Sequence, residues 1–461
     1  MNHNAEPHRW RAWKDAWLGY LDERVWTAVG RELSDWRLWL ERAVVVAAAI
    51  LAGLTVVGFT WLTEHALAAF FELRSGRTWL PLIWTPLCTA LIVWLTRRHA
   101  PGVAGSGIPQ VIAALDSTVD TSNRGLFVSL KLSAAKIILT AWGMLAGLSL
   151  GREGPSVQIA AGIMLAARRW LPRRSWVTDH GLLIAGGAAG IAAAFNTPLA
   201  GVMFAIEELS RSPEQRNSGL IMSAIVLAGV VAISVNGNAT YFGVIRVGDL
   251  GLALLLPGLL VALLSGVTGG VFSRLLIGSL GAAGEGRLSR LRRGKPVQFA
   301  FLCGLVVAGV GVVTDGMTFG SGYGHTRSML AGTTDTPVVY ALLKFIATWV
   351  TAWSGVPAGI FAPSLAIGAA VGNDVAVLIS HPQGSTLIAL GMVGFLAAAT
   401  QAPLTAFIIV MEMVDGHAMV LSLMACALVA STVSRLISRP LYASLADLQL
   451  KRIPATEAGS T

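Results

Sequence analysis

The sequence predicts an all-α polytopic membrane protein built from two related halves. Its composition points to a membrane, because 54% of the residues are hydrophobic and only 13% are charged. A soluble domain carries about 25% charged residues. In addition, three short motifs recur in the same order in both halves of the chain. The alternative, a large soluble helical bundle, would leave too much apolar surface in water.

Apolar runs recur along the chain and alternate with short polar loops. Several approach the roughly 20 residues that span a bilayer, whereas others are shorter and interrupted by Gly or Pro. Interrupted helices are tolerated at membrane depth only where they are buried in protein or line a polar cavity, which favours a transport protein over a simple anchor. The runs cover residues 43–60, 79–96, 132–150, 220–235, 251–265, 298–313 and 386–411.

The ends of the chain are polar. Residues 1–42 are rich in Trp, lack the apolar core and cleavage site of a secretory signal, and are expected to form a helix on the membrane surface, with Trp10, Trp13 and Trp17 on one face. Seven basic residues precede the first apolar run, which predicts a cytoplasmic N-terminus. Residues 285–295 are expected to be a central linker, and residues 446–461 a polar tail.

Charge and cysteine usage exclude several classes of protein. The net charge of +9 comes from basic residues in short loops beside apolar runs, so positive-inside flanking explains it better than nucleic-acid binding. Cys88, Cys303 and Cys426 lie in or beside apolar runs and are expected to be free, packed thiols. Because HExxH and clustered Cys/His motifs are absent from the sequence, we expect no enzyme, no metal site and no cofactor.

The two halves of the sequence resemble each other. Three matches in one order, at offsets of 205 to 215 positions, predict an internal duplication, which in transporters puts the substrate site at the repeat interface. The sequence alone does not reveal whether the repeats are inverted. Residues 192–199 match 397–404, with Glu207 matching Glu412; residues 151–156 match 359–364; and residues 105–107 match 320–322.

Three motifs share one design, a Gly-rich turn with a Pro that leads into an apolar helix. They are GSGIP at 105–109, GREGP at 151–155 and GIFAP at 359–363. Because Pro is favoured in the first helical turn, each predicts a helix N-terminus at membrane depth. The unpaired N–H groups and the positive dipole end there favour an anion. The alternative is that all three are ordinary loop turns.

Together with a Tyr in RPLY at 439–442, these motifs resemble, in order and spacing, the signature of the CLC family of chloride channels and chloride/proton antiporters. The resemblance runs from about residue 40 to 445. It implies two inverted repeats of tilted, partly broken helices, about 43–240 and 249–445 within a transmembrane domain at 43–445, and a homodimer in which each subunit has its own pore. Because the sequence lacks the regulatory domains of many eukaryotic relatives, we expect a multi-pass protein of a bacterial cytoplasmic (inner) membrane.

The resemblance also implies a central chloride site. Hydroxyl and amide donors bind a monovalent anion without a fixed positive charge that would trap it. The alternative for Ser106 is a helix N-cap, and for Tyr442 a tyrosine of the interfacial belt. The implied chloride-binding residues are Ser106, Gly107, Ile108, Ile360, Phe361 and Tyr442.

The resemblance gives Glu153 the role of gate, in which the ionised carboxylate occupies an anion site and the protonated form lets chloride pass. An intramembrane carboxylate is functional by default, and the alternative is an ion pair with Arg152. Arg152 and Gly154 are expected to support the gate. Glu208 is implied as the internal proton acceptor, the alternative being an acid solvated at a helix end. Glu207 and its repeat partner Glu412 are expected to be structural.

Lys136 lies 17 residues before Glu153 and matches a lysine that tunes the pore potential in the family. A companion acid of some relatives would fall at Ile112, so the detailed role of Lys136 stays open.

The intact serine at position 106 favours chloride over fluoride. The expected function is chloride/proton antiport with chloride, protons and membrane lipid as partners; the alternative is an uncoupled chloride channel.

Overall fold

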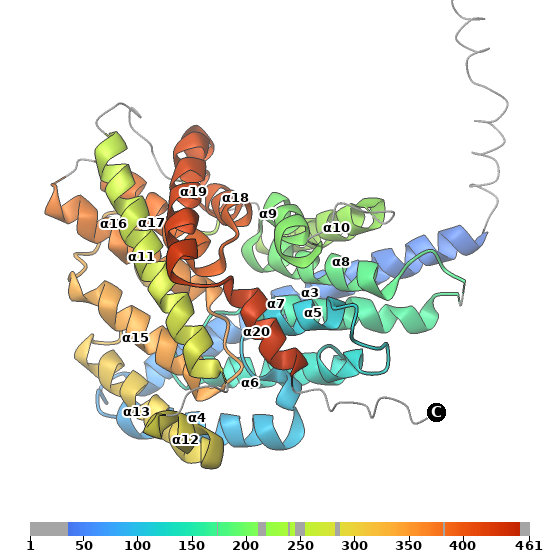
Figure 1. Cartoon of the computed structure of the whole chain (residues 1–461), viewed down its shortest axis with the longest axis horizontal. Coiled ribbons are helices and arrows are strands. Elements are labelled where there is room, and N and C mark those ends of the chain that lie inside the picture. The colour runs from blue at the N-terminus through green and yellow to red at the C-terminus, as the bar shows by residue number, and fades with distance from the viewer. Residues whose placement is uncertain are drawn as a thin grey trace, which may run out of the picture.

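The chain is almost entirely helical (Figure 1). The computed structural model describes residues 36–172, 174–210, 218–237, 240–244, 254–281, 286–380 and 383–451, and within these ranges no β-strand occurs. Six helices of the described part are long and apolar enough to cross a membrane: α3, α6 with the turn before it, α11, α13, α16 and α19. The predicted all-α polytopic fold is confirmed.

Two series of eight helices follow each other in the same order. The first series comprises α3 (Trp36–Arg74), α4 (Pro81–His99), α5 (Ile108–Leu115), α6 (Leu130–Leu145), α7 (Glu153–Ala166), α8 (Asp179–Phe195), α9 (Pro198–Phe204) and α10 (Ser218–Asn236). The second comprises α11 (Leu255–Leu280), α13 (Pro296–Val313), α14 (Tyr323–Leu330), α15 (Val339–Ser354), α16 (Phe361–Leu378), α17 (Gly384–Thr400), α18 (Pro403–Val414) and α19 (Val420–Ile437).

Among the helices of the described residues, two have no counterpart in the other series. They are α12 (Arg287–Gly294), inserted between α11 and α13, and α20 (Leu441–Leu450), which follows the second series. Short helical turns complete the chain: η1 (Pro101–Val103), η2 (Arg124–Leu126), η3 (Ala167–Trp170), η4 (Ala205–Ser210) and η6 (His417–Met419).

The two series are inverted relative to each other. Gly151 and Gly359, which occupy matching positions in the two repeats, pair as an isolated antiparallel bridge. An antiparallel bridge between equivalent residues is symmetric about a two-fold axis that passes between them. The chain therefore leaves the bridge in opposite directions, into α7 on one side and α16 on the other.

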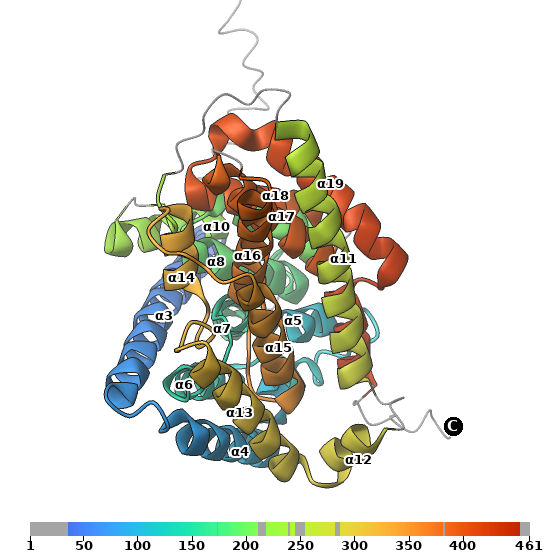
Figure 2. The ribbon, with the colours of Figure 1, turned by 90° about the vertical axis from the view of Figure 1, so that its left-hand side faces the viewer.

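The centre of the molecule is formed by helices that are apolar on all sides. Helix α7 packs against α8, α16 packs against α17, and α5 and α20 lie beside them (Figure 1). Residues 153–164 of α7 and 181–195 of α8 are buried without exception. Such helices are expected in the core of a large bundle, and their many Gly and Ala residues let the backbones approach closely. Helices α4 and α13 pack together at the periphery (Figure 2).

Matching helix breaks separate α8 from α9 and α17 from α18. Asn196 and Gln401 adopt left-handed backbone conformations with φ of +59° and +62°, and a Pro begins each following helix. The apolar run predicted at 386–411 is consequently divided into two helices.

Three predicted boundaries need correction. Helix α3 begins at Trp36, so the end of the segment predicted at 1–42 belongs to a continuous helix of 39 residues that contains no Pro. Helix α20 extends to Leu450, so the expected tail begins inside a helix whose Leu445 and Ala446 are buried. The expected linker at 285–295 contains α12. Trp10, Trp13 and Trp17 lie outside the described residues. The three cysteines are free and buried, as predicted.

Candidate anion-binding site

Three helix N-termini converge near the two-fold axis. Helices α5, α7 and α16 each begin in one of the three predicted motifs, with the Pro in the first turn, which confirms the predicted helix starts. Gly151 and Gly359 exchange N–H···O bonds of 2.7 and 3.1 Å. The N–H of Gly105 donates to the Val356 carbonyl at 3.1 Å, and its own carbonyl accepts from Ala358 at 3.2 Å. Backbone hydrogen bonds thus tie the three loops together.

The glycines of two motifs permit a close backbone approach. A Cβ atom on Gly107 would collide with the carbonyl oxygen of Gly154, and one on Gly154 would collide with the hydroxyl of Ser106. Gly107 also has a φ of +114°, which only Gly adopts readily. The Ser106 hydroxyl therefore lies directly against the start of α7.

The Glu153 carboxylate lies between two helix N-termini. The side chain is fully buried in the first turn of α7. Its Oε2 accepts a hydrogen bond of 3.3 Å from the N–H of Ala362, at the start of α16. Its Oε1 has no hydrogen-bond partner in the described part of the chain. The carboxylate thus occupies a position at which helix dipoles and unpaired N–H groups stabilise an anion.

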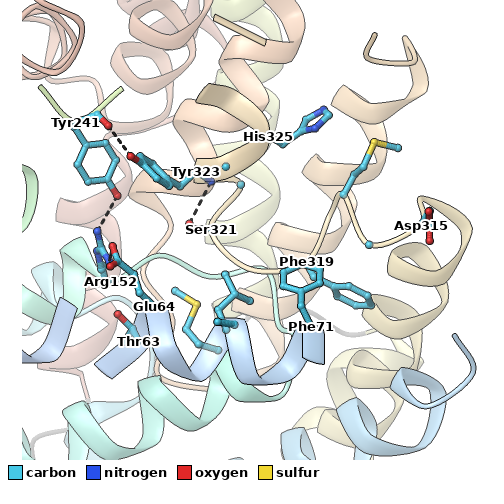
Figure 3. Close-up of a pocket in the computed structure, with 17 residues that line it drawn as sticks. Thr63, Glu64, Phe71, Arg152, Tyr241, Asp315, Phe319, Ser321, Tyr323 and His325 are labelled. Carbon is cyan, nitrogen blue, oxygen red and sulfur yellow. Dashed lines mark hydrogen bonds and ion pairs between the residues drawn. The ribbon is translucent and has the colours of Figure 1, made fainter. Parts of the chain in front are cut away.

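Arg152 turns away from Glu153. Its guanidinium donates to Glu64 at 2.7 Å and to the Tyr241 hydroxyl at 3.2 Å (Figure 3). The ion pair of Arg152 is therefore with Glu64, and the alternative of a structural Arg152–Glu153 pair does not describe the site. Neither Glu64 nor Tyr241 could be predicted from the sequence, because neither lies in a motif and both come from segments distant from α7.

The Arg152 side chain lines a cavity of about 500 Å³, which we call the Arg152 cavity (Figure 3). Glu64 contributes from α3, and Tyr323 contributes from α14. The Tyr323 hydroxyl donates to the Tyr241 carbonyl at 2.8 Å. The chain of contacts from Glu64 through Arg152 and Tyr241 to Tyr323 connects the two repeats beside the start of α7.

Ser106 and Tyr442 present their hydroxyl groups to the same region. Ser106 is 7% exposed and Tyr442 is 1% exposed, and neither hydroxyl oxygen has a hydrogen-bond partner of good geometry among the described residues. The Tyr442 hydroxyl faces Ser106 and lies within electrostatic range of Glu153 and Glu208. Its ring stacks on Phe361 with an interplanar angle of 4° and centroids 6.5 Å apart. Buried hydroxyls without partners are unusual and are available to a bound anion.

The alternatives for these two residues do not fit the structure. The N-cap of α5 is Gly107, whose N–H donates to the Gln110 side chain at 2.9 Å, so Ser106 does not act as the cap. Tyr442 is buried among helices and therefore is not a tyrosine of the membrane interface. Ile360 and Phe361 are also buried, and they belong to the N-terminal region of α16, where backbone N–H groups lack intrahelical acceptors.

Lys136 supports the loop that carries Ser106. Its ammonium is fully buried and donates to the carbonyls of Val103 at 2.8 Å and Gly105 at 2.6 Å. Ile108 follows in the first turn of α5 and is also fully buried. Lys136 therefore fixes the backbone immediately before the Ser106 hydroxyl.

Sequence reasoning missed an equivalent lysine in the second repeat. Lys344 is fully buried and donates to the carbonyls of Thr318 at 2.9 Å and Gly320 at 2.8 Å. A signal for it existed, because Lys344 follows Lys136 at the same offset that separates Gly359 from Gly151. In both repeats, therefore, a buried ammonium holds the loop that precedes a short helix.

Glu208 lies in η4, the π-helical turn that continues α9. It is only 6% exposed, so it is not a solvated acid at a helix end.

Glu207 and Glu412 form reciprocal caps between the repeats. Glu207 accepts N–H bonds of 3.2 and 2.7 Å from residues 404 and 405, at the start of α18. Glu412 accepts bonds of 3.3 and 2.8 Å from residues 199 and 200, at the start of α9. The predicted structural role of both glutamates is confirmed.

A smaller cavity of about 60 Å³ lies beside Ser106, and we call it the Ser106 cavity. Gly105, Ser106 and Ile360 are among the residues that line it. Helix α20 contributes Leu445, Leu448 and Gln449, and α12 contributes Arg292. The two cavities are lined by different helices.

Comparisons with known proteins agree with this architecture. A family model described as voltage gated chloride channel matches residues 88–435. The H(+)/Cl(-) exchange transporter ClcA of Cronobacter sakazakii (strain ATCC BAA-894) is 30% identical over 422 residues, which cover 86% of this chain and 87% of the relative. ClcA of Salmonella paratyphi A is 30% identical over 442 residues, which cover 90% of each chain.

Solved structures share the fold. A slow cyanobacterial Cl⁻/H⁺ antiporter superposes with a TM-score of 0.77 at 24% identity, covering 89% of this chain and 98% of the other. A CLC-type fluoride/proton antiporter superposes with a TM-score of 0.74 at 21% identity, covering 89% and 99%. These likenesses confirm the predicted arrangement of two inverted repeats.

Proposed function

The chain belongs to the voltage-gated chloride channel (CLC) family, since the family model spans residues 88–435 and relatives 30% identical cover most of its length, and we propose that it is a chloride/proton antiporter. The curated relatives carry the name H(+)/Cl(-) exchange transporter. In this proposal chloride and protons are the transported ions, and the exchange requires no metal or cofactor.

One observation carries the proposal. The Glu153 carboxylate is fully buried at the N-termini of α7 and α16, with one oxygen bound to the Ala362 N–H and the other without a partner in the described chain. A carboxylate in a position suited to a free anion competes with that anion. Protonation removes its charge and weakens its attraction to the helix N-termini. Proton binding to Glu153 and chloride entry are therefore coupled.

The proposed chloride site lies on the Ser106 side of Glu153. The hydroxyls of Ser106 and Tyr442 are buried, have no hydrogen-bond partner of good geometry in the described part of the chain and are suited to donate to chloride. The N–H groups of Ile360 and Phe361 add the dipole end of α16. Because these donors are neutral, chloride binds without the trap that a lysine or arginine in direct contact would create.

Proton delivery is assigned to Glu208. Its carboxylate is 6% exposed and lies in η4. In this proposal a proton passes from Glu208 to Glu153.

The assembly and orientation form part of the proposal. Helices α9 and α18, of 7 and 12 residues, are too short to span a bilayer, and their exposed side chains include Leu199 at 56% and Leu404 at 39%. A second copy packed on this face would give the homodimer, with lipid around the remaining surface. We also propose a bacterial cytoplasmic membrane with a cytoplasmic N-terminus.

The uncoupled chloride channel is the competing function. Proteoliposomes that contain the unmutated protein distinguish the two functions when a chloride gradient is imposed at equal pH on both sides. An antiporter moves protons in the direction opposite to chloride and so builds up a pH difference, and a channel moves chloride alone. Chloride flow without uphill proton movement would leave the channel as the function. Absence of chloride binding in a calorimetric titration, together with absence of flow, would exclude both.

A further inference from the structure

An ion pair adjoins Glu153 and has no counterpart in the second repeat. Arg152 is the residue before Glu153, and its Nη1 donates to Glu64 of α3 at 2.7 Å (Figure 3). In the second repeat, Ile360 occupies the position that corresponds to Arg152. Helix α11, which corresponds to α3, contains no acidic residue. The pair therefore belongs to the start of α7 and is not a general feature of the duplicated fold.

Arg152 is buried and depends on Glu64 for charge compensation. The Arg152 side chain is 8% exposed, whereas that of Glu64 is 55% exposed. The Tyr241 hydroxyl and the Thr60 carbonyl also accept from the guanidinium, at 3.2 and 3.4 Å, but both groups are neutral. Among the described residues, Glu64 is the only acid that forms a salt bridge with Arg152. Because an unpaired buried charge is costly, this contact holds the guanidinium beside α3.

The other helices packed against α7 add little charge near Glu153. Helix α5 contains no ionisable residue, and the only one in α16, Asp374, lies near the C-terminal end of that helix. In α8 the ionisable residues come first, and Asp179 pairs with Arg168, beyond the opposite end of α7. The ionisable groups that remain around Glu153 and Glu64 are His65 of α3, Lys136 of α6, Glu208 of η4, Tyr442 of α20, and Tyr241, Tyr323, His325 and Asp315 of the Arg152 cavity.

The charge of Glu64 can act on Glu153 through Arg152. A guanidinium beside a carboxylate favours the ionised form of that carboxylate. An uncompensated Arg152 would therefore hold back the protonation of Glu153, the next residue in the chain. The Glu64 carboxylate offsets the charge of Arg152 at a contact of 2.7 Å. Glu153 can then take up a proton at a higher pH than it could beside an unpaired guanidinium.

We propose that Glu64 is a positioning residue of the exchange, which holds Arg152 and offsets its charge and thereby sets the pH at which Glu153 binds a proton. The inference rests on the proposed exchange of chloride for protons and deepens it. It adds a residue that lies outside the motifs. Glu64 acts through Arg152 and is not a ligand of chloride.

The pH dependence of chloride flow tests this role in proteoliposomes that contain the full-length protein. A fixed chloride gradient is imposed at equal pH on both sides, and the rate is measured between about pH 4 and about pH 8, where carboxylates in proteins titrate. Glu64→Gln removes the charge and keeps the shape of a half-exposed side chain, whereas Glu64→Asp keeps the charge. Glu72→Gln is the matched control, because it removes the same charge from an exposed position of α3 that does not line the Arg152 cavity.

We expect Glu64→Gln to move the midpoint of the pH dependence to lower pH by about 0.5 to 1 unit. A unit charge about 10 Å away, at an effective dielectric constant of about 20 to 40, shifts a proton equilibrium by about this much. The maximal rate at low pH should be retained, because Glu153 is then protonated in both proteins. Glu64→Asp and Glu72→Gln should keep the midpoint within about 0.2 units of the unmutated protein, since exposed charges far from the site contribute little.

Two further variants separate the charge of Glu64 from a purely structural role. Tyr241→Phe removes the hydrogen bond of 3.2 Å to Arg152 without changing any charge, so the midpoint should stay in place. In a Glu153→Gln background, Glu64→Gln should leave the pH dependence unchanged, because the group on which it acts is absent.

Several results would overturn the inference. They are a midpoint that Glu64→Gln leaves in place or raises, an equal shift in Tyr241→Phe or Glu64→Asp, and a shift that persists in the Glu153→Gln background. A different result would count against the proposed function instead. If the unmutated protein moves no chloride, or if Glu153→Gln alone keeps the pH dependence of the unmutated protein, the proposed exchange fails.

Discussion

Replacing Lys136 by Met separates the structural and electrostatic contributions of the buried ammonium. The substitution keeps an unbranched, apolar side chain of similar length but removes both hydrogen bonds, at 2.8 and 2.6 Å, to the carbonyls of Val103 and Gly105. Lys344→Met is a matched control. It removes bonds of 2.9 and 2.8 Å from an equally buried ammonium in the second repeat, on a loop that does not carry Ser106.

The expected loss of stability is similar for the two variants. Each orphaned carbonyl costs about 1–3 kcal/mol, so two cost about 2–6 kcal/mol. The release of a buried ammonium offsets part of this cost, because an ion loses several kcal/mol of hydration on burial. A net decrease of about 2–3 kcal/mol in the free energy of unfolding is therefore expected for each variant.

The effect on chloride should differ between the two lysines. Lys136 reaches the residue before Ser106, and unit charges about 8 Å apart interact by about 2 kcal/mol at an effective dielectric constant of about 20, or roughly 30-fold in affinity. Lys136→Met should therefore weaken chloride binding by about 10- to 30-fold, and Lys344→Met by less than about threefold. Titration calorimetry with chloride, beside thermal unfolding in detergent, measures both quantities. Equal effects of the two substitutions on chloride affinity would show that the charge of Lys136 does not act on the bound chloride.

Other substitutions test separate parts of the structure. Glu412→Ala removes a charged cap from α9 and should lower the free energy of unfolding by about 1–2 kcal/mol, measured by denaturant unfolding in detergent. Gly154→Ala introduces a Cβ atom against the Ser106 hydroxyl and should weaken chloride binding at least about tenfold; Gly309→Ala, which meets open space on α13, should leave it unchanged. Glu208→Gln should abolish proton movement in proteoliposomes while chloride flow continues, and loss of both would argue against a role confined to protons.

The chain's own patterns predict much of the site because helix starts have local causes. A Pro in the first turn and glycines before it identify the starts of α5, α7 and α16 without reference to any distant residue. The same is true of Glu153, which is conspicuous as a carboxylate in an apolar context. The spacing between the two repeats also correctly predicted that Glu207 and Glu412 are equivalent residues.

The partners of these residues depend on long-range packing and had no local signal. Glu64 meets Arg152 only because α3 passes the start of α7, and 88 positions separate the two residues in sequence. Tyr241 reaches the same guanidinium from the segment after α10. Helix α12 was expected to be a linker because its four basic residues dominate its composition, although Leu291 packs against the core formed by α4 and α13.

The Glu153 carboxylate occupies an anion position, and a crystal structure of Glu153→Gln grown in bromide would locate the anion that takes its place. Bromide replaces chloride and is located by its anomalous scattering. We expect a bromide peak in the variant where the Glu153 carboxylate lies, within hydrogen-bond distance of the Ala362 N–H, and no peak there in the unmutated protein. If the two proteins show the same bromide positions, Glu153 does not compete with the transported anion.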